Sequence, residues 1–405
     1  MTVAIDPRSS LTVATQGRLY EVEDGERIRA CLQCGTCSGV CPVGYLMDFP
    51  PHKMIAALRA GMFEKVLATD SVWLCVSCQA CAELCPAQIP LTTGLMTVAK
   101  EEMILAGNTP DELQDALEKS QRYGNPLGES PRRRAAWIED AGFDVPLMRE
   151  IKRPVEILWF VGDYASHHPR AQIATRALAR VFREIGVDFG ILGQEESSDG
   201  DSQRLAGERG LFEMLAEKNG KALGRYEFGE VVTADPHAYN AFLNEYPGLG
   251  ISYPTRHYTE FLADNLDRLL PLFNGSVDAT VAYHDPCYLG RANGIYEQPR
   301  RLLEAIPGVR IVEMQHNRQA GLCCGGGGGG MWLDGFLWEK GRIRPSEWRV
   351  GEAIAAGADI LALACPYEAP RFEDAAKTVP GAEHLIVKDI AELLVEAMGD
   401  PQDLP

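Results

Sequence analysis

The chain has 405 residues, of which 46% are hydrophobic and 24% are charged, and its formal net charge is −18. This length accommodates two or three globular domains, each with a core of its own. A charge this negative argues against binding to nucleic acid or to an anionic membrane surface, and it permits docking to basic patches of partner proteins.

The start of the chain and its apolar segments favour a soluble protein, and the cysteine spacing described below favours the cytoplasm. Residues 1–20 lack a basic segment followed by a sustained apolar one, so we expect no secretory signal. The best apolar runs, residues 155–161 and 360–364, are only as long as strands. We therefore expect no direct membrane span and any membrane contact only through a partner subunit.

Eight of the twelve cysteines lie in two copies of the pattern Cys-x2-Cys-x2-Cys-x3-Cys-Pro, which start at Cys31 and Cys75. Bacterial two-cluster ferredoxins use this spacing, and in them the fourth cysteine of each run ligates the other cluster. The pattern predicts two 4Fe-4S clusters in a reducing compartment, one on Cys31, Cys34, Cys37 and Cys85 and one on Cys75, Cys78, Cys81 and Cys41. Zinc is the alternative, but four cysteines in each run exceed what one tetrahedral zinc ion needs.

The segments around these runs have helical rather than hairpin patterns. Pro51 suits the first turn of a helix, and the apolar residues that follow it recur at helical spacing. Residues 89–105 also have a helical pattern. We therefore expect a helical two-cluster ferredoxin domain over residues 1–107.

Residues 108–150 have the pattern of a helical linker. Asn108 to Glu112 supply a cap, a proline and first-turn acids, and the helix should end near Gly124. A second, shorter helix should start at Ser130. The arginine run 132–134 is interpreted as a solvated face, with docking of an acidic partner as the alternative.

From residue 151 onward, short apolar strands alternate with amphipathic helices. Strands are expected at residues 155–161, 187–192, 230–233, 278–283, 309–312 and 359–363. Alternation of this kind indicates parallel sheets covered by helices. The fold class is therefore α+β multidomain, with the helical ferredoxin domain followed by two repeated α/β domains over residues 151–272 and 273–405.

A candidate site in the last domain is assembled from three segments. Cys323 and Cys324 run into six glycines, while Cys287 and Cys365 each follow a predicted strand. Side chains that follow parallel strands converge at one edge of the sheet, so these thiols should meet. The alternative is a flexible glycine linker flanked by inert buried cysteines.

The same α/β unit is predicted twice, and its first copy lacks the thiols. The corresponding positions carry Asp163, Ser197, Ser198, Asp235 and Ala238. Because these groups cannot hold an iron–sulfur cluster, we expect the first copy to be a scaffold that covers the second site or lines its approach. His237 and the His167-His168 pair could meet a ligand there, and core or surface histidines are the alternative.

These motifs resemble heterodisulfide reductase over residues 25–400. The chain is similar to the small two-cluster subunit of that enzyme fused to its catalytic, cysteine-rich subunit. The resemblance implies a third iron–sulfur cluster, of noncubane type in the family, on Cys287, Cys323, Cys324 and Cys365. At the position of the family's fifth cysteine this chain has Glu368.

The substitution by Glu368 leaves several interpretations open. A carboxylate is a harder ligand than a thiolate, so the third cluster could be an altered noncubane cluster, an ordinary cubane or a smaller one. Alternatively, Glu368 is only a first-turn acid of a helix. We expect Gly325, Gly326 and Gly327 to offer backbone N–H groups to the cofactor, and His284 and Tyr288 to be candidate proton donors, with packing or capping as their alternative.

The resemblance implies a disulfide or thiol oxidoreductase whose electrons pass through the two cubanes to the third cluster. The alternative is a pure electron-transfer subunit between a flavoprotein and a quinone-linked or sulfur-metabolising complex, and a third possibility is zinc in the last site. No flavin or nicotinamide fingerprint is present, so we expect neither cofactor in this chain. Electrons should then come from a flavoprotein or a membrane quinone or haem subunit, and a small redox protein could replace the thiol substrate.

Overall fold

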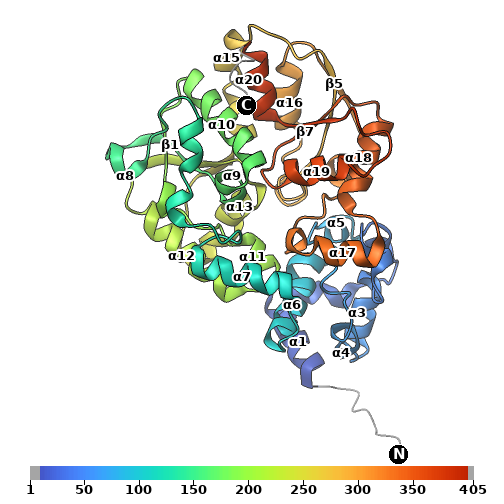
Figure 1. The fold of residues 1–405 in the computed structure, drawn as a ribbon. Helices are drawn as coiled ribbons and strands as arrows, with labels where there is room; N and C mark the ends of the chain where they lie inside the picture. Colours follow the sequence, from blue (N-terminus) through green and yellow to red (C-terminus); the bar gives the residue numbers. More distant parts are fainter. Residues whose placement is uncertain (1–9, 400–405) are drawn as a thin grey trace, which may run out of the picture. The chain divides into compact units, whose positions relative to one another are not determined.

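A computed structural model describes residues 10–399, and the chain divides into two compact units (Figure 1). The first unit comprises Met1–Gln114, Ser202–Arg209 and Gly325–Pro345, and the second comprises Asp115–Asp201, Gly210–Cys324 and Ser346–Pro405. The chain thus passes from the second unit into the first between Cys324 and Gly325.

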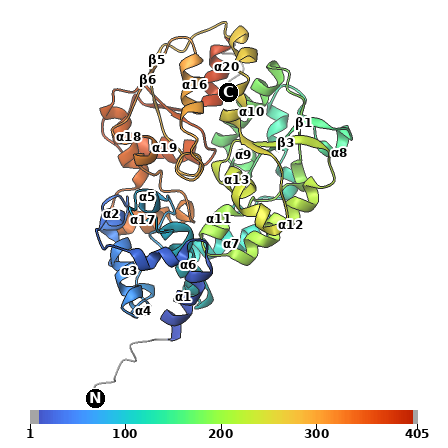
Figure 2. The same ribbon diagram turned by 180° about the vertical axis from the view of Figure 1, so that it is seen from behind.

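Helices and turns make up the first unit, and its described residues form no strand. Its helices are α1 (Ser10–Glu21), α2 (Thr36–Gly39), α3 (Pro51–Arg59), α4 (Glu64–Leu67), α5 (Ala80–Glu83), α6 (Thr97–Leu105) and α17 (Asp334–Gly341). Pro51 opens α3, where its missing N–H costs no helical hydrogen bond, and Met54, Ile55 and Leu58 are buried on one face. Although α17 is distant in sequence, it lies beside α5 in both views (Figures 1 and 2).

Two four-stranded sheets form the centre of the second unit, and every strand pair in them is parallel. The first sheet has the order β2-β1-β3-β4 and the second has the order β6-β5-β7-β8. The strands are β1 (Val155–Phe160), β2 (Phe189–Ile191), β3 (Phe228–Thr233), β4 (Thr255–His257), β5 (Ala279–Tyr283), β6 (Val309–Val312), β7 (Ile360–Leu363) and β8 (Ile386–Asp389). The prediction of parallel sheets is confirmed.

The helices that begin in or cover the second unit vary widely in length. They are α7 (Asp111–Tyr123), α8 (Met148–Ile151), α9 (Asp163–His167), α10 (Pro169–Glu184), α11 (Asp201–Leu205), α12 (Arg209–Leu223), α13 (Pro236–Asn240), α14 (Tyr258–Asp264), α15 (Leu266–Leu269), α16 (Glu297–Ala305), α18 (Pro345–Ala355), α19 (Glu368–Ala376) and α20 (Ile390–Ala397). Helices α7, α11, α12 and α18 each start or end in the first unit.

Strands β4 and β8 are the two that the sequence pattern does not predict. Each lies at the edge of its sheet and pairs with one neighbour only. Neither is an uninterrupted apolar run, since β4 reads Thr-Arg-His and β8 ends in Lys388 and Asp389. Edge strands need less apolar sequence than central ones, and this weakens their signal.

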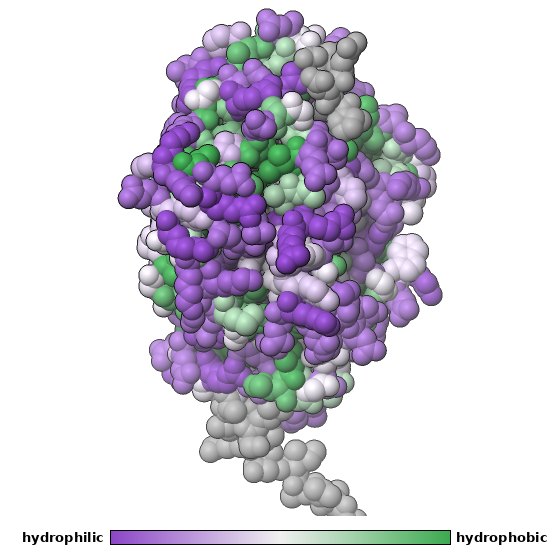
Figure 3. Space-filling view, turned by 60° about the vertical axis from the view of Figure 1, so that its left-hand side comes forward, coloured by the Kyte–Doolittle hydropathy of each residue, from purple (hydrophilic) through white to green (hydrophobic). Residues whose placement is uncertain are grey.

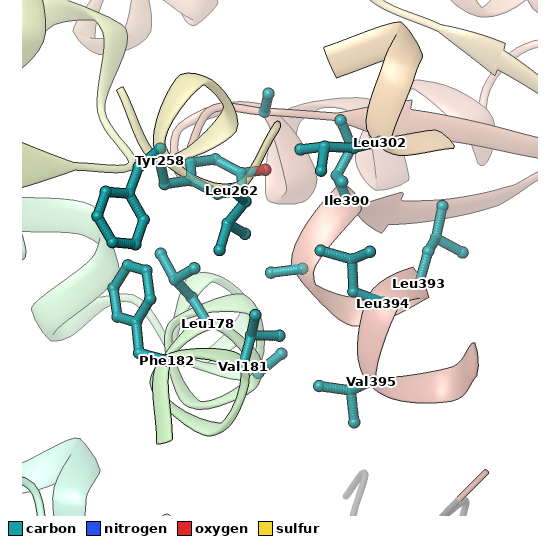
Figure 4. Close-up of a cluster of buried hydrophobic side chains, with 14 of the residues drawn as sticks. Leu178, Val181, Phe182, Tyr258, Leu262, Leu302, Ile390, Leu393, Leu394 and Val395 are labelled. Atoms are coloured by element: carbon teal, nitrogen blue, oxygen red, sulfur yellow. The ribbon is translucent and has the colours of Figure 1, made fainter. Parts of the chain in front are cut away.

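One continuous core contains side chains from both sheets and from helices α10 and α20. These two helices lie side by side (Figures 1 and 2), and in Figure 4 Val181 of α10 faces Leu394 and Val395 of α20, while Phe182 lies against Tyr258. Each such side chain contributes roughly 1.5–3 kcal/mol when fully buried. The two halves of the second unit are therefore held together by apolar packing.

On the face drawn in Figure 3, hydrophilic residues predominate and hydrophobic ones are scattered. Within residues 10–399, no helix combines the length and apolar character needed to cross a membrane.

The interpretation of the arginine run 132–134 as a solvated face is wrong for Arg134. This side chain is only 2% exposed, and its guanidinium lies 2.6 Å from Asp163 Oδ1 and 2.9 Å from Glu196 Oε1. Arg133 remains on the surface, with 70% of its side chain exposed. The run is split because two buried carboxylates of the second unit require a counter-charge.

Candidate metal centres

The eight cysteines of the two runs form two groups in the first unit. One cavity is lined by Cys31, Cys34, Cys37 and Cys85, and the other by Cys41, Cys75, Cys78 and Cys81. Each group takes three thiols from one run and the fourth from the other run. An exchange of the fourth cysteine between two clusters requires this grouping.

The two groups differ in their access to solvent. In the first group Cys34 is exposed, and the neighbouring Leu32 is 72% exposed. In the second group Cys78 and Cys81 are buried. The first group is therefore the one nearer to the surface of this unit.

The donor set of each group fits an iron–sulfur cluster. All the cysteines are free of disulfide bonds, so every thiol is available as a ligand. Burial raises the pKa of Cys81 well above its ordinary value, and the neighbouring Cys78 and Cys75 raise it further. Converging thiols of this kind ionise when a metal supplies the positive charge.

The third group of thiols lies at the carboxyl end of the second sheet. Cys287 follows β5 and Cys365 follows β7, and these two strands pair directly. Cys323 and Cys324 complete the group, and all four side chains are buried. Parallel strands whose connections diverge leave a crevice at this end, which is the usual place for a ligand in such a sheet.

Glu368 and His284 form a buried pair in this group. Glu368 is the first residue of α19, and its Oε1 lies 3.1 Å from His284 Nε2. Donor atoms of His284, Cys324 and Glu368 all lie within 4.8 Å of one another. Glu368 Oε2 is buried and has no hydrogen-bond partner in the described part of the chain. An unpaired buried carboxylate oxygen is costly, and a metal ion would satisfy it.

Arg349 of α18 orients the histidine ring. Arg349 is fully buried, and its Nε donates to Nδ1 of His284 over 3.0 Å. Because Nδ1 accepts this hydrogen bond, the proton of the neutral ring is on Nε2, which faces Glu368. Burial raises the pKa of Glu368 to about 7, while His284 acts in the opposite direction.

The cysteines of the third group differ in how readily they ionise. Hydrogen bonds from Cys323 and His284 lower the pKa of Cys324 well below its ordinary value, against the effect of burial. Burial raises the pKa of Cys365 well above its ordinary value, and Glu368 raises it further. Cys324 is therefore more easily converted than Cys365 to the nucleophilic, metal-binding form.

Tyr288 faces the first half of the second unit. Its ring centroid lies 4.3 Å from that of His237, whose Nδ1 is 2.7 Å from Asp201 Oδ2. Asp201 raises the pKa of His237 to about 9, although burial acts to lower it. His237 is thus a buried, ion-paired histidine, while His167 and His168 are half-buried.

The cysteine-equivalent positions of the first half follow the first sheet. Asp163 follows β1 and pairs with Arg134, while Asp235 follows β3 and caps α13 by accepting from His237 N. Ser197, Ser198 and Ala238 are buried. The structure brings polar but thiol-free groups to this sheet end.

The glycine run is assigned to the first unit rather than to the unit of the third thiol group. Gly325, Gly326 and Gly327 are buried in turns, and the carbonyl oxygens of Gly326 and Gly327 accept from Met331 N and Gly330 N. That their backbone N–H groups donate to a cofactor stays a prediction.

The sequence interpretation did not find Arg349 or Lys100. Arg349 lies in an amphipathic helix, and Lys100 lies in α6 directly before Glu101 and Glu102, where it is nevertheless fully buried. A charged residue in such a pattern carries no sequence signal, because its buried partners are backbone carbonyls or residues distant in the chain.

Comparisons with known proteins match both sets of cysteines. Residues 27–89 match the family described as "4Fe-4S dicluster domain", and residues 281–367 match "Cysteine-rich domain". The first match contains all eight cysteines of the two runs. The second contains the third thiol group and ends one residue before Glu368.

Three curated relatives cover most of this chain. The probable iron-sulfur-binding oxidoreductase FadF of Bacillus subtilis (strain 168) is 30% identical over 91% of this chain and 59% of its own length. The EtfAB:quinone oxidoreductase of Syntrophomonas wolfei subsp. wolfei is 33% identical over 84% of this chain and 48% of its own length. A subunit of the dihydromethanophenazine:CoB--CoM heterodisulfide reductase of Methanosarcina barkeri (strain Fusaro) is 29% identical over 91% of this chain and 94% of its own length.

The chain therefore spans about half to three fifths of the first two relatives and nearly all of the third. It contains a 4Fe-4S dicluster domain and a cysteine-rich domain, and it is homologous to this heterodisulfide reductase subunit and to FadF-like iron–sulfur oxidoreductases.

Proposed function

We propose that this chain is an iron–sulfur oxidoreductase subunit that relays electrons through two 4Fe-4S clusters to a third cluster, where a disulfide is reduced or a thiol oxidised. The first two clusters would be held by the two cysteine groups of the first unit, and the third by Cys287, Cys323, Cys324 and Cys365. The observation that carries this proposal is that the eight cysteines of the two runs line two cavities in groups of four. Four further buried cysteines, free of disulfide bonds, include Cys324 beside His284 and Glu368.

Reduction of a disulfide consumes two electrons and two protons and yields two thiols. A bound iron–sulfur cluster at the third group would supply the electrons one at a time. His284 Nε2 lies 3.1 Å from Glu368 Oε1, and this pair would hold a proton beside the third group. Arg349 keeps the ring in this orientation through its hydrogen bond to Nδ1, and burial of all three side chains excludes bulk water.

Glu368 decides how the third group would bind its cluster. Its unpaired Oε2 supports a role as a ligand, whereas its contact with His284 supports a role in holding a proton. The two roles use different oxygen atoms, so one side chain can serve both. The type of the third cluster follows from which oxygen, if any, contacts iron.

The first half of the second unit would be a duplicated copy that has become a scaffold. The strand orders β2-β1-β3-β4 and β6-β5-β7-β8 support a duplication, because β1 and β3 correspond to β5 and β7. With this interpretation we retain the expected domains: residues 1–107, the linker 108–150, the scaffold 151–272 and the site domain 273–405.

A second candidate function is electron transfer without substrate chemistry. The similarity to an EtfAB:quinone oxidoreductase favours it, as does the loss of one cysteine to Glu368. In this function the chain would pass electrons between a flavoprotein and a membrane quinone or haem subunit. In both functions we propose a cytoplasmic chain in a multisubunit complex, associated with the membrane through a partner.

Anaerobic iron and acid-labile sulfide quantitation with EPR separates these functions. Iron beyond that of two cubanes, with an oxidised-state signal that shifts when a thiol is added, is the result expected for the substrate-reducing protein. Iron for two cubanes only would refute a third cluster. The Glu368→Cys variant should change the oxidised-state signal, and Cys85→Ser, as control, should change the signal of the first cysteine group instead.

A further inference from the structure

Lys100 is a fully buried cation at the centre of the first unit. Its Nζ donates to three backbone carbonyls, of Cys75 at 2.9 Å, Leu205 at 3.2 Å and Gly328 at 2.7 Å. These acceptors come from three chain segments, namely the second cysteine run, α11 and the glycine run. One side chain thus joins the three segments that make up this unit.

The three acceptors require the charged form of Lys100. An ammonium group has three N–H donors, whereas a neutral amine has two and would direct its lone pair at a carbonyl oxygen. Burial lowers the pKa of Lys100 from its ordinary value, and the neighbouring Cys75 opposes this shift. The three hydrogen bonds therefore indicate a buried positive charge whose N–H groups all point at backbone carbonyl dipoles.

Gly328 shows that this arrangement constrains the glycine run. Its φ is +59°, and a Cβ there would collide with the Ser77 side chain and lie 2.9 Å from Lys100 Nζ. A side chain at this position would therefore be strained and would crowd the ammonium group. For Gly328, the need for glycine comes from Lys100 and its surroundings in the first unit.

We propose that Lys100 tunes the second cysteine group, raising the reduction potential of the cluster on Cys41, Cys75, Cys78 and Cys81 relative to that of the first group. The inference rests on the proposed function. Lys100 is one hydrogen bond away from Cys75, and a positive charge favours the cluster state that carries one more electron. The transfer moves one electron, oxidises the first cluster by one unit, reduces the second by one unit and needs no proton.

The exposed position of the first group and the positive charge beside the second group have separate roles in this transfer. The first group is nearer to solvent, at the exposed Cys34 and Leu32, and is suited to receive electrons from a partner. The buried charge of Lys100 makes the second group the better acceptor. At an effective dielectric constant of about 20, a unit charge at short range changes the equilibrium constant for electron transfer between the two clusters by about tenfold or more.

The test is an EPR-monitored redox titration of the complete chain, purified anaerobically with its clusters. Lys100→Met should lower the midpoint of the second group, shifting its equilibrium with the first group by about tenfold, which is about 59 mV for one electron. Lys65→Met removes an exposed charge from the same unit and should leave both midpoints unchanged. Cys34→Ser identifies the signal of the first group.

Equal midpoints in Lys100→Met and wild type would overturn the inference, as would a shift of the same size in Lys65→Met. Lys100→Arg keeps the charge and should retain a near-wild-type midpoint, whereas a general structural role would shift the midpoint in both Lys100 variants. If Lys100→Met does not fold, the wild-type titration decides, because a second-group midpoint below that of the first group overturns the inference. Absence of a cubane from the wild-type second group would instead refute the proposed function.

Discussion

Among the described ion pairs of the second unit, Arg134 is the only cation that contacts two buried acids. Replacing it by methionine removes this cation. Arg134 Nη2 is 2.6 Å from Asp163 Oδ1, Nη1 is 2.9 Å from Glu196 Oε1, and all three side chains are at most 2% exposed. Glu196 also accepts from the backbone N–H groups of Val161 and Gly162. Methionine retains the aliphatic volume of arginine and removes its charge.

The expected loss of stability is large. Removing one partner of a buried ion pair costs about 3–5 kcal/mol, and here two carboxylates lose their partner, so the upper part of this range is expected. Burial raises the pKa of Asp163 and of Glu196, and Arg134 opposes this shift. In the variant, both acids therefore take up protons on folding. The loss of stability should be complete near pH 7 and become smaller as the pH falls toward about 4, the pKa of these acids in the unfolded chain.

Urea denaturation at pH 7 and pH 5, read by hydrogen exchange of the β1 amides, measures this loss. The control is Arg133→Met, because Arg133 is 70% exposed and pairs with Glu129 on the surface, where such a pair contributes at most about 1 kcal/mol. Adding Asp163→Asn and Glu196→Gln to Arg134→Met should recover most of the stability. Similar losses in the two single variants, or a loss that grows as the pH falls, would refute the reasoning.

Two further predictions concern one turn and one helix cap. Gly328→Ala should destabilise the first unit by more than about 1 kcal/mol, because its φ is +59° and the new Cβ crowds Lys100 Nζ. Thermal unfolding measures this loss of stability. The control is Gly335→Ala, which should cost less because no atom lies near its Cβ. Burial raises the pKa of Asp389 to about 7, so its contribution to stability should fall as the pH rises from about 4 to 7. Asp389→Asn keeps the cap of α20 and should remove this slope in denaturation measured at pH 5, 6 and 7, and an unchanged slope contradicts the assignment.

The central strands could be predicted because they are apolar runs bounded by turns. Strands β1, β5 and β7 each lie between two neighbours, are almost completely buried and leave a direct hydrophobic signal. The cysteine spacing likewise predicted a grouping, since geometry allows three close thiols and one distant thiol around each cluster. These features depend on residues that are close in sequence.

Arg134 and Lys100 could not be predicted for the opposite reason. Arg134 pairs with carboxylates 29 and 62 residues away, and Lys100 donates to carbonyls up to 228 residues away. Backbone carbonyls are present at every position, so no pattern distinguishes the three that bind Lys100. The contact between His284 and Glu368 was missed similarly, although both residues were candidates, because nothing in their spacing shows that they lie side by side.

The first unit is built from three segments of the chain, and this limits how the protein could be divided into fragments. A gene fragment that stops at Gln114 would contain all eight ferredoxin-type cysteines. It would nevertheless lack Leu205 and Gly328, and the ammonium group of Lys100 would keep only one of its three carbonyl acceptors. Recombination that exchanged the dicluster module for another would have to carry two distant peptides with it, which favours inheritance of the whole chain as one piece.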